Sequence, residues 1–210
     1  MASPVALGLR AHSGWAALVA ISGPTDSPTV IDRRIIQLAN PETRGSKQPY
    51  HAAEPLPFPA AAELIARCSV ETHNFARRGL EAIVATLQEK SLRIVGCGLL
   101  LNAGRALPSL ERILASHALI HAAEGQLFRD ALAQAAAECG LAVTGIKERE
   151  LLSKAAMDLQ CPPDRLQVRL ADMGRTLGPP WREDQKKATL AAWIVLAATT
   201  LRPAKSAAMR

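Results

Sequence analysis

The chain has 210 residues, of which 49% are hydrophobic, and a formal net charge of +6. This length and apolar content suit one domain with a sizeable core, and we expect that domain to span residues 1–201, followed by a frayed tail at 202–210. Only 3% of the residues are aromatic, which argues against nucleic-acid binding by base stacking. Residues 147–210 carry a charge of +5 and residues 1–146 a charge of +1, which fits a polyanionic partner or simply a solvated basic face.

The cysteines and the apolar runs bear on the location of the protein. The four cysteines lie far apart and form no C-x-x-C pair, so we expect reduced, mostly buried thiols. The N-terminus lacks the pattern of a secretory signal. The apolar run at 188–201 suits a buried helix and is too short to cross a bilayer. We therefore expect a cytoplasmic protein without membrane contact.

The first predicted element is a β-hairpin at 5–21, where two apolar runs are joined by a short polar connection that contains Gly14. A third strand follows at 29–38, which is rich in β-branched residues. The segment 39–59 contains five prolines. These prolines predict a long surface loop without regular helix, in which Tyr50 and His51 lie.

The rest of the chain alternates between helices and strands. Apolar spacing predicts a helix over 60–90, with Gly79 as a potential kink, and a buried strand at 92–100. Pro108 and Gly140 bracket a long helix over 109–139, a fifth strand follows at 141–146, and the remainder is helical. This order predicts an α/β fold with a mixed five-stranded sheet and helices on both faces. Its strands 1–3 are antiparallel, and strands 4 and 5 are parallel.

This element order is that of the ribonuclease-H-like fold, and the second half of the chain resembles the RuvC-type Holliday-junction resolvases. The resemblance is carried by the helix at 118–137, the strand after Gly140, the sequence ERELL at 148–152, the helix at 164–177 and the closing sequence DQKKATLA at 184–191. It implies phosphodiester hydrolysis by two divalent metals. Two such ions need three or four carboxylates to hold them.

Most of the acids that the resemblance implies are missing. The aspartate of the first strand matches Arg10, and the glutamate of the fourth strand falls in the run 96–101, which contains no acid. In the last helix one aspartate matches Asp184, but the other matches Lys187. A fixed positive charge about 4 Å from a divalent ion costs roughly 8 kcal/mol at an effective dielectric of about 20. We therefore expect a divergent member of the superfamily whose usual metal site is lost, with Asp184 paired to Arg10 or Lys187, or simply capping its helix.

A second candidate site lies on the long predicted helix. His117, His121 and Glu124 are spaced at i, i+4 and i+7 and share one face of that helix. Two imidazoles one turn apart can bind a transition metal, which a carboxylate completes or orients, and zinc or manganese suits this set better than magnesium. The alternative is ordinary hydrogen bonding at a helix packed against a loop or a partner.

Two smaller sets of residues complete the candidates. His12, in the hairpin connection, and His51, in the long loop, are free to face a cleft, and with Asp184 they are the candidate catalytic residues. Arg105 follows the fourth strand at the edge where ligands of such sheets bind. Together with Arg10 and Lys187, it is a candidate for binding an anion.

Three hypotheses follow. The first is a divergent RuvC-like protein that binds nucleic acid or another anionic ligand. The second is a metal-dependent hydrolase that uses His117, His121 and Glu124. The third is a non-catalytic homodimer whose interface is the helix at 108–139. The sequence alone leaves enzymatic activity open.

Overall fold

The computed structural model describes residues 2–102 and 106–200. In this part of the chain five strands form one mixed sheet in the order β3-β2-β1-β4-β5. The antiparallel pairs are β1 with β2 and β2 with β3, whereas β4 runs parallel to both β1 and β5. The strands are β1 (Pro4–His12), β2 (Trp15–Ser22), β3 (Thr29–Gln37), β4 (Arg93–Leu101) and β5 (Val143–Lys147). The predicted α/β fold with this strand pattern is confirmed.

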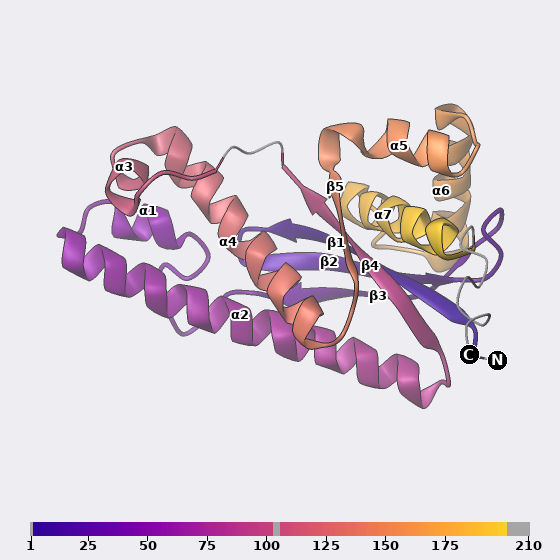
Figure 1. The fold of residues 1–210 in the computed structure, drawn as a ribbon, viewed down its shortest axis with the longest axis horizontal. Helices are drawn as coiled ribbons and strands as arrows, with labels where there is room; N and C mark the ends of the chain where they lie inside the picture. The colour runs from indigo at the N-terminus through magenta and orange to yellow at the C-terminus, as the bar shows by residue number, and fades with distance from the viewer. Residues whose placement is uncertain (1, 103–105, 201–210) are drawn as a thin grey trace, which may run out of the picture.

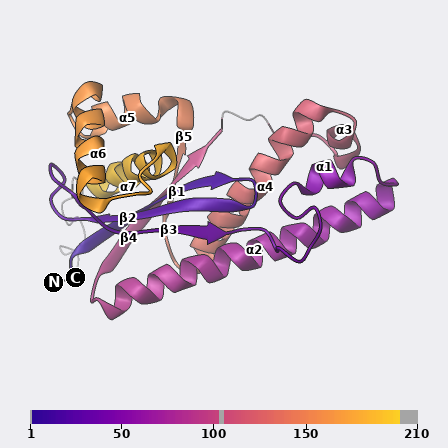
Figure 2. The same cartoon turned by 180° about the vertical axis from the view of Figure 1, so that it is seen from behind.

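The helices form a layer on each face of the sheet (Figure 1 and, from behind, Figure 2). α2 and α4 pack on one face, and α7, backed by α5 and α6, packs on the other. No helix in the described part of the chain is long and apolar enough to span a membrane. The helices are α1 (Pro49–Ala53), α2 (Phe58–Glu89), α3 (Leu110–Leu114), α4 (His117–Glu138), α5 (Leu151–Asp158), α6 (Pro163–Leu177) and α7 (Glu183–Thr200).

Side chains of β1 alternate between the two helical layers. Leu7 and Leu9 are fully buried in the core beneath α2 and α4, whereas Ala6 belongs to the core beneath α7. Because successive strand residues point to opposite faces, Gly8, Arg10 and His12 lie on the same face as Ala6. The polar end of β1 is therefore directed at α7.

The backbone of α7 lies unusually close to the sheet. A Cβ atom at Gly8 would overlap the backbone carbonyl of Ala188, and one at Gly98 of β4 would collide with the carbonyl of Ala191. Glycine inside a strand marks such a close approach of another backbone. These two contacts fix the position of α7 over β1 and β4, and they bring its first turns beside Arg10.

The proline-rich segment contains a helix, so the prediction of 39–59 as a loop without regular helix is wrong. Pro49 is the first residue of α1, where its fixed φ favours the helical conformation and its missing N–H costs no hydrogen bond. α2 begins soon afterwards and passes through Gly79 as one helix. Gly79 does not divide this helix. Its missing side chain makes room for Ile36 of β3.

The helix predicted at 109–139 is two helices, α3 and α4, separated by a turn. Ser116 has extended backbone angles, φ −143° and ψ 112°, at the N-cap position of α4, where serine is a preferred residue. Leu110 and Leu114 of α3 pack beside Ile65 of α2. The turn thus starts α4 at His117.

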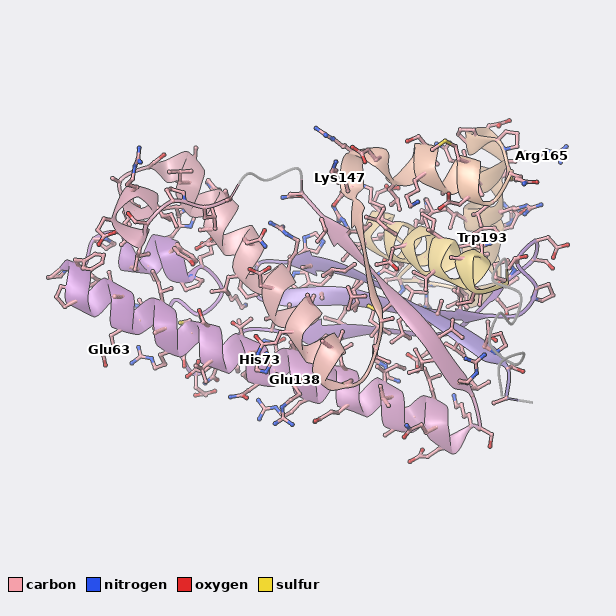
Figure 3. The ribbon with its side chains drawn as sticks, in the orientation of Figure 1. Glu63, His73, Glu138, Lys147, Arg165 and Trp193 are labelled. Atoms are coloured by element: carbon pink, nitrogen blue, oxygen red, sulfur yellow. The ribbon has the colours of Figure 1, made fainter. Side chains whose placement is uncertain are left out.

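The apolar side of α4 packs against α2 and the sheet of the same chain. Phe128, Leu132 and Ala135 are fully buried in the core shared with α2 and the sheet. Near the end of α4, a carboxylate oxygen of Glu138 lies 3.0 Å from Nε2 of His73 on α2, and Figure 3 shows these two side chains between the helices. A homodimer through this helix stays a prediction.

The cysteines are free thiols in the structure, as expected. Three of them are buried, and burial raises the pKa of Cys97 to about 12. Cys139 is partly exposed. The predicted tail at 202–210 and the candidate residue Arg105 lie outside the described residues.

Candidate functional site

Arg10 contacts two carboxylates at the carboxyl end of β1. Its Nη2 donates a hydrogen bond to Oε1 of Glu148 over 2.8 Å, and its Nε donates to Oε2 over 3.3 Å. Its Nη1 also donates to Oδ1 of Asp184. The Arg10 side chain is only 18% exposed, so these ion pairs are partly shielded from solvent.

Two more side chains extend this network. Nζ of Lys187 donates to Oε1 of Glu148 over 2.9 Å. Nε2 of His12 lies 2.7 Å from Oδ1 of Asp184 and 2.9 Å from Nη1 of Arg10, and the imidazole stacks on the ring of Trp15. With neutral histidine, two carboxylates balance two cations. We name this group the charge cluster, with the members Arg10, His12, Glu148, Asp184 and Lys187.

Three elements bring the charge cluster together. Arg10 and His12 extend from the end of β1, and Glu148 directly follows β5. Asp184 and Lys187 lie on the first turns of α7, next to the end of β5 (Figure 1). Because β1, β4 and β5 are parallel, the cluster lies at the carboxyl edge of these strands, where ligands of such sheets bind.

The charge cluster stabilises the charged forms of Glu148, Asp184 and Arg10. Burial alone would raise the pKa of Glu148, but hydrogen bonds and charge interactions with Arg10 and Lys187 hold it below its ordinary value. Burial likewise opposes the shift at Asp184, where His12 and Arg10 lower the pKa. Burial alone would lower the pKa of Arg10, but Glu148 and Asp184 raise it above its ordinary value. Arg10 and the two carboxylates therefore favour the charged form of one another.

A cavity of about 330 Å³ opens beside the charge cluster. Glu148, Lys186 and Lys187 form part of its polar lining, and leucines of α5, α6 and α7 form its apolar part. Arg149, which follows β5, and Arg182, which precedes α7, are exposed near this opening. The edge of the sheet thus combines a balanced charge cluster with cations at its rim.

The charge cluster does not suit two divalent metals. Its guanidinium occupies the space between Glu148 and Asp184, and β4 supplies no acid. A two-metal centre needs three or four carboxylates, and a cation at its centre would repel both ions. The arrangement suits fixed ion pairs instead.

Of the two ion-pair partners expected for Asp184, the structure shows Arg10. Asp184 pairs with Arg10, whereas Lys187 pairs with Glu148. Glu148 was not among the candidate residues, although its position directly after a parallel strand is the signal that points to this edge.

A second group of side chains lies between α1 and the start of α4. Nε2 of His117 lies 3.1 Å from Nε2 of His121, and His51 of α1 is the third member. One nitrogen from each lies within 4.8 Å of the others, and we name these residues the histidine cluster. Glu124, predicted as the third ligand, contacts His51 instead. Its Oε1 accepts the backbone N–H of His51 over 3.2 Å and lies 2.9 Å from Nδ1 of that ring.

Sequence comparison and structure comparison give different results. No protein-family model matches the sequence, and neither does any curated protein. In structure, the chain is similar to Thermus thermophilus RuvC in complex with a Holliday junction substrate, with a TM-score of 0.53 and 10% identity over 94% of this chain and 95% of that one. The chain has a RuvC-like, ribonuclease-H-like fold. A second structure of Thermus thermophilus RuvC gives the same score and identity, over 94% and 96% of the two chains. In this RuvC-like fold, Arg10 stands on the first strand, where the resemblance implies an aspartate.

Proposed function

We propose that this chain is a nucleic-acid-binding protein of RuvC-like fold that does not use the two-metal hydrolysis of phosphodiesters. The observation that carries the proposal is the contact of the Arg10 guanidinium with both Glu148 and Asp184. This contact replaces a metal-binding arrangement by ion pairs, while the surrounding fold is kept. The similar structure of Thermus thermophilus RuvC holds a Holliday junction substrate, which supports nucleic acid as the ligand.

The phosphates would contact the rim rather than the charge cluster itself. Arg10 and Lys187, predicted as anion-binding residues, are both engaged by carboxylates, so a phosphate would have to displace those partners. Arg182 is exposed, and Lys186 lies 3.9 Å from Glu183, a long distance for an ion pair. Lys186 lines the cavity beside the cluster, and Arg182 directly precedes the lining residue Glu183. We assign phosphate contact to these two cations.

Fluorescence anisotropy with a labelled four-way DNA junction and a labelled duplex tests the binding. Phosphate contacts release counterions, so affinity falls roughly 12-fold as salt rises from 50 to 200 mM if these two cations contact two phosphates. We expect this salt dependence, and we expect the DNA to remain intact in the presence of Mg²⁺ or Mn²⁺.

A matched pair of double variants locates the contact. Arg182→Glu with Lys186→Glu should weaken binding at least tenfold, because two attractive charges become repulsive. Arg67→Glu with Arg78→Glu makes the same change in net charge on α2, which covers the opposite face of the sheet, and should have a small effect. No binding of either DNA at low salt, or an equal loss in the two double variants, would contradict the proposal.

A further inference from the structure

We propose that His51, His117 and His121 form a binding site for one zinc-type cation, which joins α1 to α4. This site is separate from the charge cluster and does not depend on nucleic-acid binding. The first observation is the distance between the two histidines on α4, whose Nε2 atoms are 3.1 Å apart. Two nitrogen ligands at about 2.0–2.1 Å from a tetrahedral zinc ion are about 3.3 Å apart, so His117 and His121 need only a small adjustment.

The third imidazole comes from a different part of the chain. His51 lies on α1, in the segment between β3 and α2, and its ring is edge-to-face with both helix rings, with centroids 5.3 Å from His117 and 4.6 Å from His121. One nitrogen of each ring lies within 4.8 Å of the other two. Three imidazole nitrogens converging from two elements are a ligand set typical of zinc.

Glu124 holds the backbone of His51 and lies beside its ring. Its carboxylate is nearly buried, with 3% of the side chain exposed, and lies 2.9 Å from Nδ1 of His51 while also accepting the backbone N–H of that residue. Nδ1 of His51 makes no hydrogen bond in the described structure, although this carboxylate oxygen is 2.9 Å away. A small turn of the ring would direct a proton on Nδ1 at Glu124 and leave the Nε2 lone pair available for a metal. Carboxylates that hold a metal-binding histidine in this way raise its basicity and fix its tautomer.

The site has room for an exchangeable fourth ligand. His117 and His121 are exposed, and His51 is partly buried, so solvent reaches the side opposite Glu124. A cation with three imidazole ligands therefore keeps one position for water or another small donor. α4 begins at His117, directly after the turn at Ser116, and its first turns lie beside α1.

Metal titration of the untagged protein tests this inference. After removal of metal with a chelator, equilibrium dialysis against micromolar Zn²⁺ should give one bound ion per chain. Thermal unfolding should shift upward by roughly 5–10 °C when free Zn²⁺ is about 100 times Kd, because the ion binds the folded chain. Co²⁺ in place of Zn²⁺ should give the intense visible absorption of a four-coordinate site.

Four variants separate this site from general metal binding. His117→Ala with His121→Ala should abolish binding of Zn²⁺ and the Co²⁺ absorption, and His51→Ala should weaken both. Glu124→Gln should keep the stoichiometry but lower the affinity about 10–100-fold. His73→Ala is the matched control, because His73 pairs with Glu138 elsewhere on α2 and α4.

The outcomes are distinct. His117 and His121 are exposed, so their replacement should leave the circular dichroism spectrum unchanged and keep the comparison valid. Absence of bound Zn²⁺ in the wild type, equal binding in the double variant, or an equal loss in His73→Ala would overturn the site. None of these results depends on DNA binding, so failure of the metal site and failure of the proposed function are distinguishable.

Discussion

At the scale of single residues, Arg10 has the largest effect on the chemistry of this edge of the sheet. It joins Glu148 and Asp184, which come from different parts of the chain, in one partly shielded network. Removing one member of such a network leaves charges without their partners at a place with limited access to water. The side chain of Arg10 is therefore expected to contribute to stability.

Arg10→Met should lower the free energy of unfolding at pH 7 by about 1–3 kcal/mol, between the values for exposed and fully buried ion pairs. It should also change the response to acid. Both carboxylates have folded pKa values below their ordinary values of 4.5 and 3.8, so their contribution is complete above these values and is lost as the pH falls through the folded values. In Arg10→Met this acid-induced loss should be smaller. Urea unfolding between pH 3 and pH 7 measures both effects.

Arg77→Met is the control for this prediction. Arg77 pairs with Glu81 one turn along α2, where both side chains are more than 40% exposed. Its loss should cost only about 0.3–0.5 kcal/mol and leave the acid dependence unchanged. If the free energies of unfolding of Arg10→Met and the wild type change in parallel from pH 7 to pH 3, the ion pairs do not stabilise the charged carboxylates.

At the scale of elements, the position of α7 depends on two glycines of the sheet. Gly8 and Gly98 allow the carbonyls of Ala188 and Ala191 to lie directly on β1 and β4. The same helix carries Asp184 and Lys187. A change that moves α7 away from the strands would therefore also separate the charge cluster.

Gly8→Ala should destabilise the protein by about 2–4 kcal/mol, because the added methyl group meets backbone atoms that cannot rotate away. Gly125→Ala on α4 is the comparison. There the added Cβ meets only the guanidinium end of Arg129, which can move, and alanine favours the helix. Thermal and urea unfolding of both variants should show a loss for Gly8→Ala alone, and an equal effect in the two would show that the close approach of α7 is unimportant.

The sequence predicts elements better than it predicts their junctions. Apolar periodicity is local, so the strands and α2 follow from it. The rule that parallel strands need crossover connections gives which strands are antiparallel and which are parallel. α1 was missed because the prolines of this segment indicate a loop without helix. Proline is disfavoured inside a helix but favoured at its first residue, where Pro49 lies. The break at Ser116 was missed because an N-cap serine inside an apolar pattern resembles an ordinary helix residue.

The candidate site is harder to predict because it depends on contacts between distant segments. The acids missing from β1 and β4 are visible in the sequence, and so is the spacing of His117 and His121. The approach of His51 to these two residues, and of Glu148 to Arg10, depends on how the chain turns after β3 and after β5. No local pattern carries that information, so the sequence predicts Glu124 as the third ligand of this site.

At the scale of the whole molecule, the RuvC-like fold is kept at 10% sequence identity to Thermus thermophilus RuvC. A sheet with two helical layers requires apolar alternation and glycines at close contacts, and it tolerates many sequences that satisfy these needs. The charged residues at its carboxyl edge are not needed for that packing. Fold and chemistry can therefore change separately in this chain.

Arg10→Asp combined with Lys187→Asp tests this separation. The double variant would have carboxylates at positions 10, 148, 184 and 187, and hard divalent cations prefer such oxygen ligands. We expect it to bind Mn²⁺ or Mg²⁺ and to be stabilised by these ions in thermal unfolding, because without them its carboxylates repel one another. Wild type and Arg10→Met should show no stabilisation by Mg²⁺, and none by Mn²⁺ when His117→Ala and His121→Ala remove the histidine cluster. A double variant that folds but does not respond to either ion would show that this edge lacks the geometry of a metal site.

The contacts of Arg10 also limit which substitutions this chain tolerates. A cation at position 10 is tolerated because carboxylates at 148 and 184 face it, and either carboxylate alone would leave part of that charge unpaired. Substitutions at these positions are therefore expected to co-vary among relatives of this chain. An acid placed at position 10 alone would face two carboxylates with no cation between them, so such a substitution is expected to be tolerated only together with changes at 148 or 184.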